Sequence, residues 1–373
     1  MHKTDLEWIK KYPWDLSFAK IQNYEMCIVA VRQDGLLLED VRWDELNLTK
    51  EQIYNLYLDA VKENGLALKY IKEQTPRICM EAVKQDGKAL KYVKNQTPEM
   101  CLISVKEYGL ALEDVKWDEL SLTKEQIYNL YLDAVKENGF ALRYVKLDEL
   151  EGNQTYELCL EAVKQNGRAL MLVEEQSNEL CTEAVKQNGL ALEYVKWSEL
   201  EGKLLKKQLD EICLEAVREN GYSLKYVKKQ SQKICIEAVR QNGLALMHVK
   251  EQSNEICLEA VRQNGLALGY VENKIYEVCK EALKQNKRAI KYIIDKEKYL
   301  KEFEIKYLEA HGKVREVIAI KEDGEWLFAI GYQYKITKDE FIERIYNENG
   351  GFNPEKGINV HRQVYLDFLK EFE

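Results

Sequence analysis

Nine cysteines are the residues of this chain with the widest range of possible chemistry, because thiols can form disulfides, bind metals or act as nucleophiles. All nine occupy one slot of a recurring phrase, which reads Cys-Leu-Glu-Ala-Val-Arg-Gln-Asn-Gly at Cys257–Gly265. They are Cys27, Cys79, Cys101, Cys159, Cys181, Cys213, Cys235, Cys257 and Cys279. Where no insertion intervenes, neighbours are 22 residues apart. A fixed step of this size indicates a tandem-repeat protein.

The common register of the cysteines argues against disulfides and metal sites. Equivalent atoms of stacked repeats lie about 8–10 Å apart, whereas the Cα atoms of a disulfide lie about 4.4–6.8 Å apart. The sequence has no Cys-x-x-Cys, and His2, His248, His311 and His361 are too scattered to complete a zinc pattern. We therefore predict small buried thiols and no cofactor, with reactive or metal-bound cysteines as the alternative.

No catalytic motif stands out. The sequence lacks the phosphate-binding Gly-x-x-x-x-Gly-Lys-Ser/Thr, the nucleophile motif Gly-x-Ser-x-Gly and the metalloprotease motif His-Glu-x-x-His. Near the C-terminus, Gly350–Pro354 and His361–Arg362 could line a site, although a loop and the start of a helix are the simpler interpretation. We predict a protein that is not an enzyme and has no small-molecule substrate. An enzyme with its site within residues 296–373 is the third alternative.

Two rows of cations form the strongest surface regularity. Counting from the cysteine slot as position 0, Lys or Arg stands at +5 in all eleven copies of the phrase. A second row at +15 comprises Arg42, Lys72, Lys94, Lys116, Lys146, Lys196, Lys228 and Lys250. Tyrosines recur at +13, namely Tyr70, Tyr92, Tyr144, Tyr194, Tyr226, Tyr270 and Tyr292. Such rows could follow a phosphate backbone while the tyrosines stack on bases.

Neighbouring residues favour a different interpretation of these rows. Position +2 is acidic in nine copies and +6 is mostly Glu or Gln, so both weaken the field of the +5 row. We expect a solvated, salt-bridged face, with nucleic-acid binding as the alternative. The tyrosines border the apolar positions +10, +11 and +14, so packing between repeats explains their recurrence. The alternative is that they contact a ligand.

Composition limits the class of protein. The 373 residues are 46% hydrophobic and 32% charged, and the net charge of −9 favours solubility and disfavours nucleic acid. No stretch approaches the roughly 20 apolar residues of a membrane span, and residues 1–14 lack the apolar core of a secretion signal. We expect a cytoplasmic protein without a membrane partner.

The repeated phrase itself predicts two helices per repeat. Apolar residues at −1, 0, +3 and +4 form one helical stripe, and Gly at +8 suggests a left-handed cap after that helix. Small or aliphatic residues at +10, +11 and +14 predict a second helix of about two turns rather than a strand. In Gln96–Glu99, Thr97 is the expected N-cap of the next helix and Pro98 its first residue.

Eleven copies run from Cys27 to Cys279 when Tyr57 and Tyr131 are accepted in the slot. Insertions follow Trp43, Trp117, Leu147 and Trp197. Thr49 and Thr123 are expected to cap lengthened first helices. The tryptophans are expected to fill the space that an insertion opens, and an alternative role is to anchor a partner.

Both ends depart from the pattern. Leu16, Ala19 and Lys20 repeat it in degraded form, which predicts an N-terminal cap over residues 1–23 ahead of an array over 24–294. Residues 295–373 form a small α+β domain in this interpretation. We expect a helix to Ala310, a hairpin from Val314–Ile320 and Trp326–Tyr332, and a helix opened by Thr337–Glu340. A final helix passes through Tyr365 and Phe368, and the domain is expected to seal the last repeat.

The phrase Cys-x-x-Ala-Val-Lys-x-x-Gly-x-Ala-Leu-x-x-Val resembles the tandem repeats catalogued as a domain of unknown function, number four-one-one-six, over residues 24–294. This resemblance implies an all-α solenoid found in bacterial and large-virus proteins, with no established activity and no functional residue to transfer. We predict a non-enzymatic scaffold that binds another protein, and the family's distribution suggests an inhibitor or adaptor in conflict between bacteria and phages. The candidate contacts are Trp43, Trp117, Trp197, Lys72, Lys94, Lys116, Lys146, Tyr70, Tyr92 and Tyr144.

Overall fold

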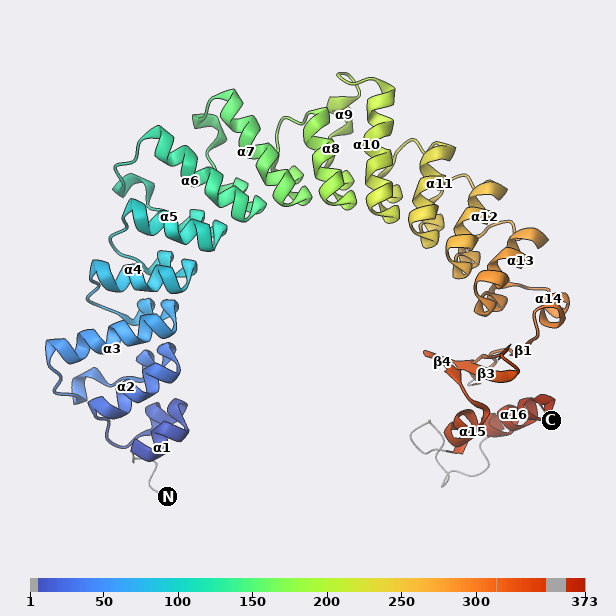
Figure 1. Cartoon of the computed structure of the whole chain (residues 1–373), viewed down its shortest axis with the longest axis horizontal. Helices are drawn as coiled ribbons and strands as arrows, with labels where there is room; N and C mark the ends of the chain where they lie inside the picture. Colours follow the sequence, from blue (N-terminus) through green and yellow to red (C-terminus); the bar gives the residue numbers. More distant parts are fainter. Residues whose placement is uncertain (1–5, 313, 347–359, 373) are drawn as a thin grey trace. The chain divides into compact units, whose positions relative to one another are not determined.

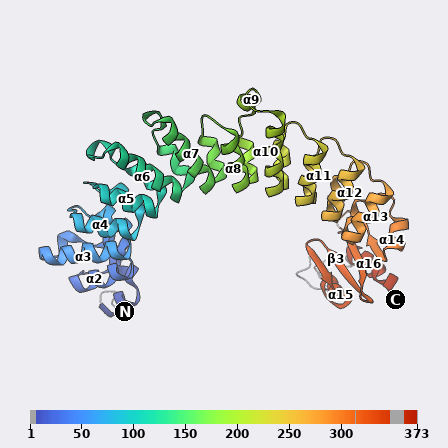
Figure 2. The same cartoon turned by 45° about the horizontal axis from the view of Figure 1, so that its top comes forward.

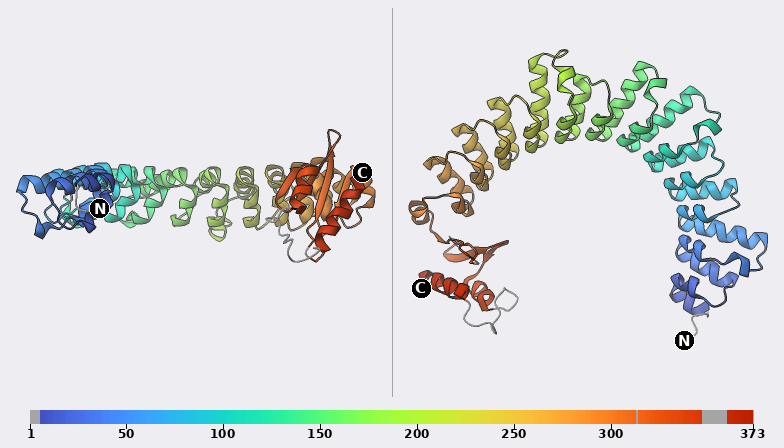
Figure 3. Two further views of the ribbon diagram at one scale, coloured as in Figure 1. Left: turned by 90° about the horizontal axis from the view of Figure 1, so that it is seen from below. Right: turned by 180° about the vertical axis from the view of Figure 1, so that it is seen from behind.

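The computed structural model describes residues 6–312, 314–346 and 360–372. The chain divides into two compact units, Met1–Glu219 and Asn220–Glu373. Within each unit, helices stack on one another in chain order (Figure 1, Figure 3). Each repeat is too small to bury its own apolar stripe, so its stability comes from the neighbouring repeats.

Each repeat contributes one α-helix and one six-residue 3-10 helix, and the described residues contain eleven such pairs. The α-helices are α2 (Tyr24–Gln33), α3 (Lys50–Glu63), α4 (Pro76–Gln85), α5 (Pro98–Glu107), α6 (Lys124–Glu137), α7 (Gly152–Gln165), α8 (Asn178–Gln187), α10 (Lys206–Glu219), α11 (Gln232–Gln241), α12 (Asn254–Gln263) and α13 (Tyr276–Gln285). The 3-10 helices are η2 (Gly35–Asp40), η4 (Gly65–Tyr70), η5 (Gly87–Tyr92), η6 (Gly109–Asp114), η8 (Gly139–Tyr144), η10 (Gly167–Leu172), η11 (Gly189–Tyr194), η12 (Gly221–Tyr226), η13 (Gly243–His248), η14 (Gly265–Tyr270) and η15 (Lys287–Tyr292). The predicted α-solenoid of eleven hairpins is confirmed.

The predicted stripe forms the core. In the repeat of α5 and η6, Cys101, Val105, Ala111 and Leu112 are all fully buried. The hydroxyl of Thr97 accepts a hydrogen bond from the backbone N–H of Met100 at 3.3 Å, and Pro98 is the first residue of α5. The predicted N-cap is therefore confirmed.

The prediction of a left-handed glycine cap at +8 is wrong. Among the described residues, glycines with positive φ are Gly312, Gly324 and Gly331, and all three lie outside the repeats. Glycine is needed at +8 because another repeat comes close. A Cβ on Gly87 would lie 2.6 Å from the carbonyl oxygen of Ser104, which occupies +3 of the next repeat.

The insertions lengthen the helices that follow them. Helices α3, α6, α7 and α10 have 14 residues, whereas the uninterrupted α4 and α5 have 10. Thr49 and Thr123 each form a capping box at the start of the longer helix, as predicted. The inserted segments begin with short helical turns, η3 (Trp43–Glu45), η7 (Trp117–Glu119), η9 (Leu147–Glu149) and α9 (Trp197–Leu200).

The N-terminal cap has the form of an incomplete repeat. Helix α1 (Leu6–Lys11) is followed by η1 (Pro13–Phe18), and Leu16 and Ala19 are buried against the next repeat. Over the described residues, the degraded pattern therefore folds like the intact copies.

The C-terminal region contains a four-stranded antiparallel sheet in the order β1-β2-β3-β4. Its elements are α14 (Glu297–Glu302), β1 (Ile305–Leu308), β2 (Val317–Glu322), β3 (Glu325–Ile330), β4 (Gln333–Ile336), α15 (Lys338–Tyr346), α16 (Val360–Leu369) and η18 (Lys370–Phe372). The predicted hairpin turns at Asp323–Gly324, and both residues have positive φ. The predicted helix to Ala310 is wrong beyond Glu302, because β1 follows and pairs with β2.

Helices α15 and α16 lie on one side of this sheet (Figure 2), where the rings of Phe328 and Phe341 stack at 5.0 Å. On the opposite face, Ile318 and Ala329 are also buried. The last repeat contacts the sheet through Lys287, whose ammonium donates to the carbonyl of Lys321 at 3.4 Å. These contacts agree with a region that covers the end of the array. The predicted boundaries at residues 23 and 294 stay predictions.

Candidate functional site

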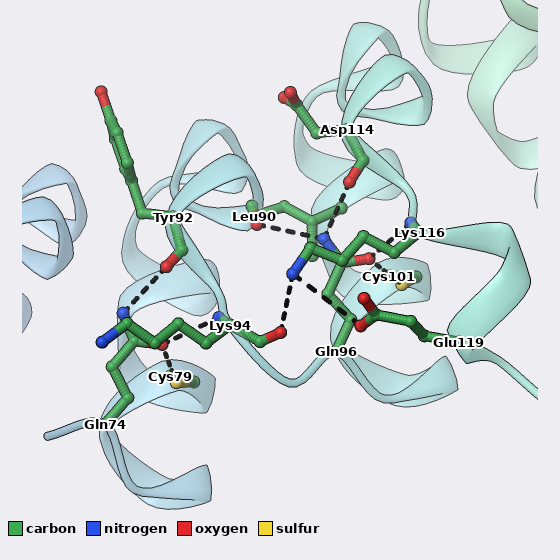
Figure 4. Close-up of polar contacts among 10 residues, drawn as sticks. All are labelled: Gln74, Cys79, Leu90, Tyr92, Lys94, Gln96, Cys101, Asp114, Lys116 and Glu119. Carbon is green, nitrogen blue, oxygen red and sulfur yellow. Dashed lines mark hydrogen bonds and ion pairs between the residues drawn. The ribbon is translucent and has the colours of Figure 1, made fainter.

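A buried or half-buried glutamine at position +17 ties five of the six uninterrupted repeats to the next (Figure 4), and Lys274 stands at this position in the sixth. The amide N–H groups of Gln96 donate to the carbonyl oxygens of Leu90 at 3.3 Å and Asp114 at 2.8 Å. Its amide oxygen accepts from the backbone N–H of Lys116 at 2.9 Å and from the thiol of Cys101 at 3.6 Å. Equivalent bonds involve Gln22, Gln74, Gln176, Gln230 and Gln252. Because the thiol donates a hydrogen bond to this glutamine, the cysteine slot has a structural role.

The lysines at +15 use their ammonium groups inside the array. Lys94 donates to the carbonyl oxygen of Lys72 at 2.6 Å, and Lys116 donates to that of Lys94 at 2.7 Å (Figure 4). Lys146 instead forms an ion pair with Glu149 at 3.3 Å. Of the candidate contacts in this row, Lys72 alone has no side-chain hydrogen bond or ion pair within the described parts of the chain.

The cations at +5 are largely neutralised by carboxylates. Lys164 pairs with Glu161 at 3.1 Å and Lys186 pairs with Glu183 at 2.9 Å, each within one helix. Arg32 reaches Asp59 in the next repeat at 2.7 Å. This arrangement agrees with the predicted salt-bridged face. Because these pairs are exposed, water and salt screen them and each adds little to stability.

Six of the seven tyrosines at +13 are half-buried and Tyr270 is exposed, and their rings lie on the surface of the 3-10 helices. The hydroxyl of Tyr70 donates to Glu39, and that of Tyr144 donates to Glu113 at 2.9 Å. Each bond joins one repeat to the preceding one. In Figure 4 the side chain of Tyr92 points away from the glutamine network. The hydroxyl ends of Tyr70 and Tyr144 therefore take part in contacts between repeats, and the rest of each ring stays accessible.

The tryptophans pack within the array. The ring centroids of Trp43 and Tyr57 are 5.2 Å apart, and those of Trp117 and Tyr131 are also 5.2 Å apart. Where these insertions remove the glutamine, tyrosine replaces cysteine in the slot, and the backbone N–H of Lys146 bonds to Tyr131. Trp43, Trp117 and Trp197 are half-buried. Their first role is to fill the inserted turn, and contact with a partner stays a prediction.

A continuous surface remains on the 3-10 helices of Met1–Glu219. We call positions +9, +12 and +13 of these repeats the 3-10 surface. Its aromatic and aliphatic members at +9 and +13 are half-buried or exposed: Trp14, Phe18, Leu36, Leu66, Tyr70, Tyr92, Leu110, Phe140, Tyr144, Leu172, Leu190 and Tyr194. Exposure is greatest at the N-terminal end, at 64% for Trp14 and 69% for Phe18. Positions +9 and +13 share one surface only in the folded 3-10 helix, so no local motif in the sequence links them.

The thiols offer no reactive site. All nine are buried and unpaired with one another, and burial raises the pKa of Cys101 to about 11 and that of Cys181 to about 12. Within residues 6–312, 314–346 and 360–372, no group of His, Cys, Asp and Glu is arranged to hold a metal, and no helix has the length and apolarity to cross a membrane. Gly350–Pro354 lie outside the described residues, as do the side chains of His361 and Arg362.

A family model described as a domain of unknown function, DUF4116, matches the chain five times, at residues 54–97, 155–200, 210–252, 233–276 and 253–297. The repeats within these stretches match that family. Each match spans about two of the helical hairpins described above. No curated protein matches the chain.

Proposed function

We propose that the protein is a non-enzymatic scaffold whose 3-10 surface binds another protein. One observation carries this proposal. Eight of the eleven cations at +5 pair with carboxylates, and several at +15 bond to carbonyl oxygens of the chain itself, whereas rings and aliphatic side chains at +9 and +13 stay accessible in repeat after repeat. Aromatic side chains are enriched in protein interfaces and supply much of their binding energy.

The alternative of a nucleic-acid-binding solenoid receives less support. A phosphate backbone needs a row of available cations, and the ammonium groups of Lys94 and Lys116 already donate to the main chain. Acidic residues on the 3-10 surface, such as Glu39 and Glu113, would repel phosphates. An inhibitory or adaptor role between bacteria and phages stays a prediction from the resemblance.

Affinity capture from the native cell with quantitative mass spectrometry tests the proposal. We expect a protein partner in stoichiometric amount with the wild-type chain. Its recovery should fall at least tenfold with the triple variant Tyr70→Ala, Tyr92→Ala, Tyr144→Ala, since buried aromatic anchors commonly contribute 2 kcal/mol or more, about thirtyfold in affinity.

The matched control changes the α-helix surface of the same three repeats, with Lys62→Ala, Lys84→Ala and Lys136→Ala. These lysines are exposed at position +5, so recovery of the partner should stay unchanged. Thermal unfolding of each variant verifies that the array is intact. Equal recovery with the tyrosine variant, or enrichment of RNA in place of a protein, would refute the proposal.

A further inference from the structure

The 3-10 surface carries a local concentration of positive charge on two adjacent helices, η4 and η5. Lys88 and Lys91 are three residues apart on η5, so they project from the same side of a helix with three residues per turn. Lys69 occupies the position of Lys91 one repeat earlier, and η4 packs against η5. All three side chains are exposed. With Tyr70 and Tyr92 they form what we call the Lys/Tyr patch.

The ammonium groups of this patch lie over aromatic rings. Lys69 is 4.4 Å from the ring centroid of Tyr70, and Lys91 is 4.8 Å from that of Tyr92. Lys88 lies 5.0 Å from the ring of Tyr108. A cation–π contact orients an ammonium group without neutralising its charge. These lysines therefore differ from Lys94 and Lys116, which are bonded to carbonyl oxygens.

Carboxylates lie at both ends of the patch on the same surface. On the N-terminal side, Glu39 accepts the hydroxyl of Tyr70. On the C-terminal side, burial and the nearby Glu113 raise the pKa of Asp114, and the neighbouring Lys91 opposes this shift. The positive region is thus about two repeats long, or roughly 20 Å at about 10 Å per repeat.

We infer that the Lys/Tyr patch binds a short acidic segment of the partner protein. This inference rests on the proposed function and adds the chemistry of the bound segment. An extended peptide rises about 3.3 Å per residue, so roughly six residues span the patch. Carboxylates on alternate residues would meet the lysines, and the peptide backbone between them would lie along the tyrosine rings.

The boundaries of the patch favour a peptide over a nucleic-acid strand. A strand that continued along the array would bring phosphates to Glu39 at one end and to Glu113 and Asp114 at the other. A protein segment can carry carboxylates along the length of two repeats and other types of side chain beyond them. The 3-10 surface also changes from charged to apolar further along the chain, where Met171 and Leu172 of η10 stand at the positions of Lys91 and Tyr92.

Fluorescence anisotropy with the full-length protein tests the inference. The probe is a short fluorescein-labelled peptide of alternating glutamate and leucine, and a labelled oligothymidylate of similar length is the second probe. We expect the peptide to bind the wild-type chain in a salt-sensitive way. The variant Lys69→Glu, Lys88→Glu, Lys91→Glu should weaken that binding about tenfold or more, because like charges now face each other.

The control variant is Lys62→Glu, Lys84→Glu, Lys136→Glu, which makes the same change of charge on the α-helix surface. It should alter peptide binding less than about twofold if the patch, rather than net charge, is responsible. Three results overturn the inference: no binding of the peptide to the wild-type chain, equal loss with both variants, or tighter binding of oligothymidylate that is lost with the patch variant.

The captured partner separates this inference from the proposed function. If the tyrosine variant loses the partner while the Lys69, Lys88 and Lys91 variant retains it, the scaffold stands and the acidic segment is wrong. If neither variant changes recovery, both are wrong. If both variants lose the partner and the α-helix control retains it, both stand.

Discussion

The residue at position +8 lies where the 3-10 helix of one repeat passes beside the α-helix of the next. At Gly167, a Cβ would lie under 3.0 Å from the carbonyl oxygen of Ala184, and the backbone N–H donates to the side chain of Gln187 at 2.6 Å. A methyl group here must push two repeats apart. The constraint comes from the neighbour and not from the backbone angle of the glycine itself.

Gly167→Ala should lower the free energy of unfolding by roughly 1–3 kcal/mol, as overpacking does in a close-packed interior. The midpoint of urea unfolding measures the effect. Gly152→Ala is the control, because Gly152 begins α7 and has nothing within 4 Å of an added Cβ. It should be neutral or slightly stabilising. Equal stability of the two variants would contradict the proposed contact.

Gln96→Ala should cost at least about 2 kcal/mol, because it leaves the part-buried carbonyl of Asp114 and the part-buried N–H of Lys116 without a partner. Asn95→Ala, at the exposed neighbouring position, should change stability by less than about 0.5 kcal/mol. Chemical unfolding of both proteins provides the comparison. A loss for Gln96→Ala no greater than for Asn95→Ala would show that the glutamine does not hold the repeats together.

Burial could be predicted for individual residues, but their partners could not. The register of Cys101 and Val105 showed that they face inward, because helical periodicity is local information. The role of Gln96 could not be predicted, since its hydrogen bonds join carbonyl and N–H groups of two repeats that only the fold brings together. The left-handed cap at the +8 glycines was wrongly predicted for the same reason, because the constraint on these glycines comes from the next repeat.

At the scale of elements, helix starts are specified by capping residues next to them in sequence. Thr123 accepts the backbone N–H of Gln126 at 3.2 Å, and the side chain of Gln126 accepts the N–H of Thr123 at 2.9 Å. Such boxes were predictable for Thr49, Thr123 and Thr337. Strand β1 was not, because Ile305–Leu308 is a strand only by pairing with β2, and the chain before it reads as helix.

Thr123→Ala should destabilise the array by about 1 kcal/mol, the usual cost of losing an N-cap side chain. Thr123→Ser keeps the accepting hydroxyl and should retain most of the stability. Hydrogen exchange at the first turn of α6 measures the local effect: exchange should speed up for the alanine variant and stay near wild type for the serine variant. Equal exchange in all three proteins would show that the box is not formed.

At the scale of the whole molecule, the thiols report on nine of the eleven repeats at once, since tyrosine occupies the slot in the other two. The pKa values of Cys159 and Cys181 are raised by burial, to about 11 and about 12. A thiol whose pKa is raised on folding contributes its full stability below the ordinary thiol pKa, and this contribution is lost as the pH rises through the raised value. Stability should therefore decline in alkaline solution.

Ellman's reagent at pH 8 should modify the native protein only slowly, because the thiols are both inaccessible and protonated. After denaturation all nine should react rapidly. Absorbance of the released thiolate gives the count. Rapid reaction of several thiols in the native protein, or fewer than nine after denaturation under non-reducing conditions, would contradict a spine of free buried cysteines.

Site-specific photo-crosslinking in the native cell tests the central claim most directly. A photoreactive residue replaces Tyr92 on η5 in one protein and Lys84 on α4 of the same repeat in another. The account predicts a crosslinked protein partner from position 92 and none from position 84. Crosslinks from position 84 alone, or an adduct at position 92 that carries nucleic acid, would contradict it.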